Sequence, residues 1–167
     1  SCASSIVYKE YYDSTYLHKI FNKLAFVGFK YTADELALAG KYPQEMKKAF
    51  ELAKKVNQRT IRVFGFNGRN DESDAFRYFI WSGNLLKELS LEMAKRVLDA
   101  HESNPDQPKK EKLMDTKNNL SGIKSAHELI KNKRFTQKRL EREALILLKN
   151  RKLNVVSPRN IIPEWRN

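Results

Sequence analysis

Cysteine, glycine and proline are all scarce in this chain. The single cysteine, Cys2, among 167 residues excludes an intramolecular disulfide and therefore the class of small disulfide-framework domains. Six glycines and five prolines are too few for a low-complexity or disordered chain. The longest apolar patch, residues 24–29, is far shorter than the roughly 18 apolar residues that a membrane-spanning helix needs. These absences leave a domain that must be held together by an apolar core.

The chain has enough apolar mass for one such core. Hydrophobic residues make up 41% of the sequence, and they include nine Phe, seven Tyr and two Trp. This is enough for the core of one domain of this length. Lys and Arg total 32 against 20 for Asp and Glu, which gives a net charge of +12. A field of this sign attracts polyanions such as nucleic acid, anionic lipid or the acidic polymers of a bacterial envelope. Charge alone does not choose among these partners.

Hydrophobic spacing and helix caps predict a mainly α single domain. Thr32 followed by Glu35 is a capping-box pattern, Pro43 suits a first helical turn, and Ser90 suits an N-cap. Gly83 lies inside an expected helix and indicates close packing there. The expected helices cover 16–29, 32–38, 43–56, 73–89, 91–101, 120–131 and 136–148, with at most short strands at 60–64 and 153–156. This pattern divides the chain into an N-terminal extension (1–15), one helical catalytic domain (16–157) and a C-terminal tail (158–167).

Polar residues gather in three clusters where the expected helices meet loops, namely 74–77, 99–104 and 114–119. Catalytic groups favour such places, because a rigid element positions them while substrate can still reach them. Glu102 is the strongest single candidate, since the apolar face of its helix would desolvate the carboxyl and raise its pKa toward that of a general acid. Asp99, three residues earlier, would act in the same direction. On position alone, a solvated carboxylate at a helix end is the favoured interpretation of Glu102.

A family resemblance changes that preference. The segment from His101 to Asn104 carries Glu-Ser-Asn and resembles the helix end of animal-type lysozymes, where the Glu is the catalytic acid. The cysteine framework of those enzymes is absent, so the resemblance is to the wider lysozyme superfamily, including its goose-type and transglycosylase branches. The chain is also similar to bacterial domains that share Asp-Ala-Phe-Arg, Asp-Ala-His-Glu and Met-Asp-x-x-Asn-Asn, here at 74–77, 99–102 and 114–119. Tyr78 and Lys117 stand where those domains often carry His.

The resemblance implies a lysozyme-like muramidase that cleaves the glycan strands of peptidoglycan with Glu102 as the acid. A similarity to lysozymes of predatory bacteria implies deacetylated peptidoglycan as a possible substrate. Asp115 is the first choice for the second catalytic group and Asn119, as a water-orienting amide, the second choice. If neither is well placed, the sugar's own hydroxyl would give an anhydro product. The expected substrate-binding residues are Asp74, Arg77, Tyr78, Asp99, His101 and Asn118.

No metal or other cofactor is predicted. A site made of His101, His127 and Asp115 is the alternative, but no His-x-x-x-His spacing supports it. The enzyme is expected to be a monomer outside the cytoplasm, periplasmic or secreted, and drawn electrostatically to an anionic envelope. A small residue before a cysteine also occurs at the end of a bacterial lipoprotein cleavage site, but a lipid anchor at Cys2 is the less favoured interpretation. Two other functions stay open: a toxin-type hydrolase of another class, and a basic nucleic-acid-binding module, for which no base-reading motif is recognised.

Overall fold

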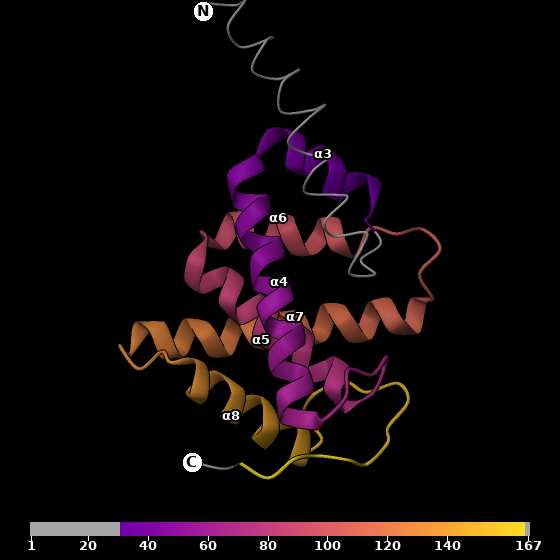
Figure 1. Cartoon of the computed structure of the whole chain (residues 1–167), viewed down its shortest axis with the longest axis vertical. Coiled ribbons are helices and arrows are strands. Elements are labelled where there is room, and N and C mark those ends of the chain that lie inside the picture. The colour runs from indigo at the N-terminus through magenta and orange to yellow at the C-terminus, as the bar shows by residue number, and fades with distance from the viewer. Residues whose placement is uncertain (1–30, 166–167) are drawn as a thin grey trace, which may run out of the picture.

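A computed structural model describes residues 31–165, and within that range the chain forms six helices and no strand. Figure 1 shows α4 crossing the length of the domain, α3 and α6 lying at one end, and α7 and α8 lying toward the other. The mainly α prediction is confirmed, while the helix expected at 16–29 and the extension 1–15 lie outside the described residues. The helices are α3 (Ala33–Lys41), α4 (Pro43–Phe64), α5 (Glu72–Glu88), α6 (Leu91–His101), α7 (Lys109–Lys131) and α8 (Gln137–Lys149).

Four of the helix starts that the sequence predicted are confirmed, those of α3, α4, α6 and α8. The Thr32 side chain accepts from the N–H of Glu35, and the Glu35 carboxylate accepts from the N–H of Thr32, which completes the capping box of α3. Pro43 occupies the first turn of α4. Ser90 and Thr136 cap α6 and α8 with their hydroxyl oxygens. Each cap satisfies a backbone N–H that the helix itself cannot pair.

Both expected strands are wrong. Residues 60–64 form the last turns of α4, because Val56, Thr60 and Phe64 recur at a spacing of four and bury one helix face. Gly65 ends α4 with a left-handed φ of 82°, and its N–H donates to Ile61. Residues 153–156 lie in irregular structure. Apolar β-branched residues favour strands only weakly, and tertiary packing overrides that preference here.

α7 begins eleven residues before the predicted start of 120, at Lys109. Pro108 sits at its N-cap with φ −56°, a value already close to helical, so the helix can start directly after the proline. The segment 109–119 had been expected to be partly loop. As a result the cluster at 114–119 lies on a rigid helix rather than at a helix–loop junction.

α5 is the central helix and packs against α4, α6, α7 and α8. Its inner side chains Phe76, Phe79, Ile80 and Leu85 are completely or almost completely buried. α7 approaches α5 very closely at Gly122, where an added Cβ would lie 2.1 Å from the carbonyl oxygen of Phe79. Gly83 packs against Leu140, as the sequence predicted, with an added Cβ 2.8 Å from a leucine methyl. The glycine at 122 therefore sets how near α7, with its polar cluster, comes to α5.

Two further contacts hold the helices in register. Glu141 of α8 is buried, and both its oxygens accept from the guanidinium of Arg59 in α4, at 2.7 and 2.8 Å. At the start of α5, Glu72 accepts from the backbone N–H groups of Arg159 and Asn160, at 3.0 and 2.8 Å. The described part of the segment expected as a tail thus packs on the domain.

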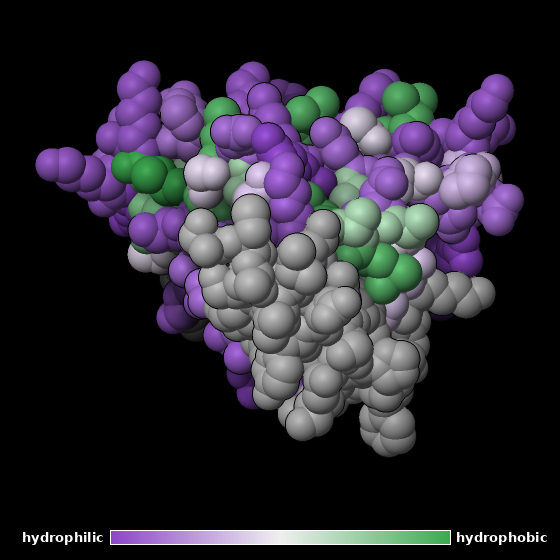
Figure 2. Space-filling view, turned by 90° about the horizontal axis from the view of Figure 1, so that it is seen from above, coloured by the Kyte–Doolittle hydropathy of each residue, from purple (hydrophilic) through white to green (hydrophobic). Residues whose placement is uncertain are grey.

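The surface seen from the α3 end is mostly hydrophilic, with hydrophobic residues in small separate groups (Figure 2). None of the helices in residues 31–165 has the length and apolarity needed to cross a bilayer.

Candidate functional site

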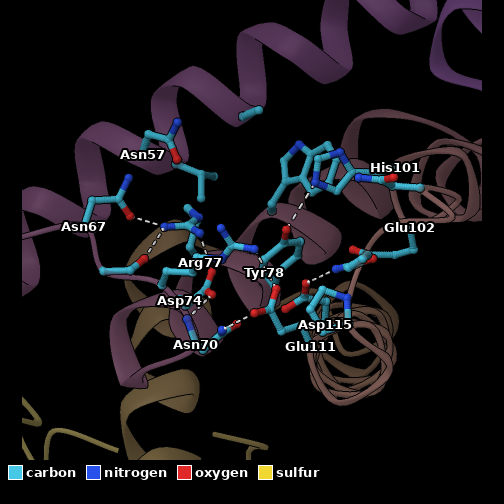
Figure 3. A pocket seen from close by; sticks show the side chains of 18 of the residues that line it. Asn57, Asn67, Asn70, Asp74, Arg77, Tyr78, His101, Glu102, Glu111 and Asp115 are labelled. Atoms are coloured by element: carbon cyan, nitrogen blue, oxygen red, sulfur yellow. Dashed lines mark hydrogen bonds and ion pairs between the residues drawn. The ribbon is translucent and has the colours of Figure 1, made fainter. Parts of the chain in front are cut away.

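A cleft of about 490 Å³ lies where α4, α5, the end of α6 and the start of α7 meet. Residues 67–70 and residues 104–108 line it together with these helices. All three polar clusters found in the sequence contribute to it: Asp74 and Arg77 from α5, His101 and Glu102 from α6, and Asp115 from α7. Figure 3 shows Tyr78 between these groups. The structure therefore brings together three clusters that are spread over residues 74–119 of the chain.

Glu102 and Asp115 form a pair of buried carboxyl groups in this cleft, called the carboxyl pair below. They are 5% and 4% exposed, and no hydrogen bond reaches either oxygen of Glu102 or Oδ1 of Asp115 within the described residues. Asp115 Oδ2 accepts from the Gln107 amide at 3.0 Å. The Gln107 and Asn119 amides lie near enough to Glu102 to favour its charged form, although no bond forms there. Buried carboxyl oxygens without partners are costly and uncommon in folded proteins, and where they occur they favour protonation or a functional role.

The carboxyl pair has a high affinity for protons. Burial, and then the negative charges of Glu102 and Asp74, raise the pKa of Asp115 to about 8. Burial also raises the pKa of Glu102, against the opposing influence of His101 and the two nearby amides. Two carboxylates that share a poorly solvated site resist simultaneous ionisation. At neutral pH Asp115 therefore holds a proton.

Asp74 and Arg77 shape one wall of the cleft. The Asp74 carboxylate accepts from the Arg77 guanidinium and, at 2.5 Å, from the backbone N–H of Asn70. Arg77 also donates to Asn67 and to the carbonyl of Gly68. Burial raises the pKa of Asp74 even though Arg77 and the Asn70 bond act to lower it. These contacts tie the loop after α4 to α5.

His101 and Tyr78 form the opposite wall. His101 Nδ1 lies 3.2 Å from Glu35 Oε2, and its Nε2 lies 3.2 Å from the Tyr78 hydroxyl oxygen. The Trp81 ring packs against the imidazole in a T-shaped arrangement, with the ring centroids 5.0 Å apart. Burial, and then the charges of Asp115 and Glu102, raise the pKa of Tyr78 well above its ordinary value, so its hydroxyl stays protonated at neutral pH.

Two expected substrate-binding residues lie elsewhere. Asp99 is exposed and does not line the cleft, because the buried side of α6 passes through Ala94, Val97 and Leu98. Asn118 is completely buried, and its amide exchanges two hydrogen bonds of 2.9 Å with the backbone of Asn154. Asn118 therefore fastens the loop after α8.

Asn119, the second choice for the second catalytic group, lies one turn after Asp115 on α7. It is 4% exposed and near Glu102, with its Oδ1 unbonded within the described residues. It thus stays with the carboxyl pair, behind the residues that line the cleft.

The alternative metal site made of His101, His127 and Asp115 is wrong. His127 is exposed on α7, twelve residues after Asp115, which is a separation of roughly 18 Å along a helix. Within residues 31–165 no group of three or more His, Cys, Asp or Glu side chains could hold a metal ion.

Three residues that line or support the cleft were not predicted from the sequence. Glu35 had been interpreted only as a capping residue, although it also binds His101. Glu111 accepts from Arg69 at 2.8 Å and from Asn70 at 2.7 Å, and these two bonds lower its pKa. Gln107 comes from the loop before α7. Because each pairing joins separate elements, spacing in the sequence carries no signal for it.

The chain belongs to the family described as "Domain of unknown function (DUF6973)", whose family model matches residues 36–151. No curated protein and no solved structure matches the chain. The matched range contains the carboxyl pair, Asp74, Tyr78 and His101, and it begins one residue after Glu35.

Proposed function

We propose that this domain is a cell-wall hydrolase that cleaves the glycan strands of peptidoglycan by general acid catalysis. The observation that carries the proposal is the carboxyl pair, which borders an open cleft and in which three of the four oxygens lack a hydrogen-bond partner among the described residues. Cleavage of a glycosidic bond needs one protonated carboxyl group for the leaving oxygen and a second group for the other face of the sugar. Asp115 supplies the protonated carboxyl group at pH 7, and Glu102 beside it is the second group.

The pKa values suggest the division of roles. Asp115, with a pKa of about 8, holds its proton at pH 7 and donates it to the glycosidic oxygen. Glu102, ionised at that moment, stabilises the positive charge that builds at the anomeric carbon or directs a water molecule to it. This division reverses the one that the lysozyme resemblance implies, in which Glu102 is the acid.

The charge of the cleft favours a substrate with a cationic group. Five acidic residues line the cleft against two arginines and His101, and with Asp115 protonated and His101 charged these side chains still sum to a negative charge, although the whole chain carries +12. An amino sugar without its acetyl group carries such a charge, so deacetylated strands suit the cleft better than acetylated ones. The basic outer surface would hold the enzyme near an anionic envelope. The acidic residues are Asp74, Glu102, Asp106, Glu111 and Asp115.

A digestion of purified sacculi tests the proposal. Acetylated and deacetylated sacculi are incubated with wild type, Glu102→Gln and Asp115→Asn, and soluble muropeptides are measured by chromatography. Each variant is expected to lose about 10²–10⁴ in rate, the usual effect of removing a general acid or its partner. Asp99→Asn is the matched control, since Asp99 is an exposed carboxylate on the helix that ends at Glu102. The proposal is rejected if wild type releases nothing from either preparation.

The pH dependence separates the two possible donors. If Asp115 is the donor, wild-type activity falls as pH rises through about 8, because its carboxyl then loses the proton. The residual activity of Glu102→Gln should keep a falling alkaline limb and lose the acidic limb. If the residual activity instead loses the alkaline limb, Glu102 is the donor. Analysis of the product ends distinguishes hydrolysis from anhydro-sugar formation.

A further inference from the structure

Three side chains from three helices form a hydrogen-bonded line that ends in the cleft. Glu35 of α3 contacts His101 at the end of α6, and His101 contacts the hydroxyl of Tyr78 on α5. Figure 3 shows the Tyr78 hydroxyl with His101 on one side and Asp115 and Glu102 on the other. We propose that Glu35 and His101 are positioning residues that orient the Tyr78 hydroxyl as a hydrogen-bond donor to the bound substrate. This inference rests on the proposed function for the identity of the substrate.

The Glu35 side chain is held in place by contacts other than the one with His101. Its carboxylate is 2% exposed, and Oε1 accepts from the Thr32 N–H at 3.0 Å while Oε2 faces His101. The Thr32 hydroxyl in turn donates to the carbonyl of Ala100, at 2.5 Å, on the last turn of α6. The capping box of α3 is therefore docked against the helix end that carries His101. The capping of α3 does not by itself require the hydrogen bond from Thr32 to Ala100.

The Glu35 carboxylate decides which ring nitrogen of His101 carries a hydrogen. An ionised carboxylate only accepts, so Nδ1 must be the N–H that faces it. When the imidazole is neutral, Nε2 is then an acceptor and takes the hydrogen of the Tyr78 hydroxyl. When the imidazole is charged, Nε2–H donates to the Tyr78 oxygen, and the phenolic hydrogen turns toward the cleft.

The surroundings of His101 favour the charged ring. Burial opposes the charge, but the hydrogen bond and charge of Glu35, followed by the charges of Glu102 and Asp115, raise the pKa of His101 above its ordinary value. These carboxyl groups face the ring from α3, from the residue that ends α6 and from α7, while α5 contributes Tyr78 and the uncharged Trp81. Over the pH range in which His101 is charged, Tyr78 offers a hydrogen to the carboxyl pair or to a sugar oxygen between them.

Nitrogen-15 NMR of the histidine side chains tests this arrangement without any substrate. The chain has three histidines, the signal of His101 is assigned by its loss in His101→Asn, and the exposed His127 serves as the internal reference. Above its pKa, wild-type His101 is expected to carry its hydrogen on Nδ1. In Glu35→Gln the pKa of His101 should fall. A hydrogen on Nε2 in wild type, or an unchanged His101 pKa in the variant, overturns the inference, and the first of these results is read on the wild-type protein.

Activity then tests the contact with substrate. Tyr78→Phe keeps the ring and removes one hydrogen bond, so kcat should fall about tenfold on the better sacculus preparation, with little change in KM. Glu35→Gln should move the loss of activity at high pH to a lower pH, which a merely structural defect would not do. If Tyr78→Phe cleaves at the wild-type rate, Tyr78 makes no productive contact and the inference fails. If wild type cleaves no glycan while the NMR result holds, the proposed function fails and the arrangement of the three side chains stands.

Discussion

Asp115→Asn is expected to make the protein more stable while removing activity. In the unfolded chain Asp115 has its ordinary pKa of 3.8, whereas in the folded protein burial and the charge of Glu102 raise it to about 8. Between these values the folded state binds more protons than the unfolded state, so the free energy of unfolding falls as pH rises. Asparagine has almost the shape of aspartic acid and remains neutral. The free energy of unfolding of the variant therefore lacks this decrease with rising pH.

The size of the effect follows from the two pKa values. Each pKa unit corresponds to ~1.4 kcal/mol, so a change from 3.8 to about 8 corresponds to a stability loss on the order of 5 kcal/mol by pH 8. Single domains have a total stability of about 5–15 kcal/mol, so the loss is a large fraction of it. Near pH 4 the loss is small, and wild type and Asp115→Asn should unfold at similar urea concentrations.

Urea unfolding followed by circular dichroism, repeated between pH 4.5 and pH 8.5, measures this difference. The stability of Asp115→Asn relative to wild type should rise steadily over that range. Glu111→Gln is the matched control of opposite sign, because the bonds from Arg69 and Asn70 lower the pKa of Glu111 and its charge stabilises the folded state. That variant should be less stable than wild type at pH 7. An Asp115→Asn protein less stable than wild type at pH 8 would refute the electrostatic argument.

Three further outcomes are expected. Gly122→Ala should lower the free energy of unfolding by about 2 kcal/mol, because its methyl group meets the backbone of Phe79 at 2.1 Å. Gly83→Ala should cost less, because its closest contact is the flexible end of Leu140 and the Ala126 Cβ lies farther away, at 3.3 Å; equal costs would contradict this packing. Arg59→Ala should cost about 3 kcal/mol in urea unfolding, because it leaves the buried Glu141 unpaired, and adding Glu141→Gln should recover part of that loss. A chelator should leave the Tm unchanged, and a clear decrease would reveal a structural metal ion.

The sequence predicted most of the fold because its helices carry local signals. Thr32, Ser90 and Thr136 cap their own helices, and a cap involves only residues a few positions away. The failures occurred where the signal is not local. Residues 60–64 have strand-like composition, and only the packing of Thr60 and Phe64 on the core keeps them in α4. The early start of α7 at Lys109 was hidden because its first turns carry few apolar residues.

Part of the candidate site was also predictable from local signals in the sequence. Polar clusters beside apolar helices identified Asp74, Glu102 and Asp115, which the structure places around one cleft. Asp99 was included because a spacing of three from Glu102 suggests a shared helix face. Asp99 is turned about 100° around the helix axis from buried Leu98, however, and its side chain is exposed to solvent. Glu35 was missed because its partner is 66 residues away. A contact between residues on two different helices cannot be predicted from the spacing of residues in the sequence.

The contacts at both flanks of residues 36–151 reach beyond the range that defines the family. Glu35 precedes that range, and Arg159, whose guanidinium lies 3.7 Å from buried Asp71 and whose N–H binds Glu72, follows it. A protein trimmed to the family boundaries would keep every reactive group but would lose the carboxylate behind His101 and the donors at the start of α5. The part of the chain that the family model matches is therefore smaller than the part that holds the cleft in place. Residues on both sides of the matched range can be exchanged to change the surroundings of His101 and of the start of α5 while the side chains that line the cleft within that range stay the same.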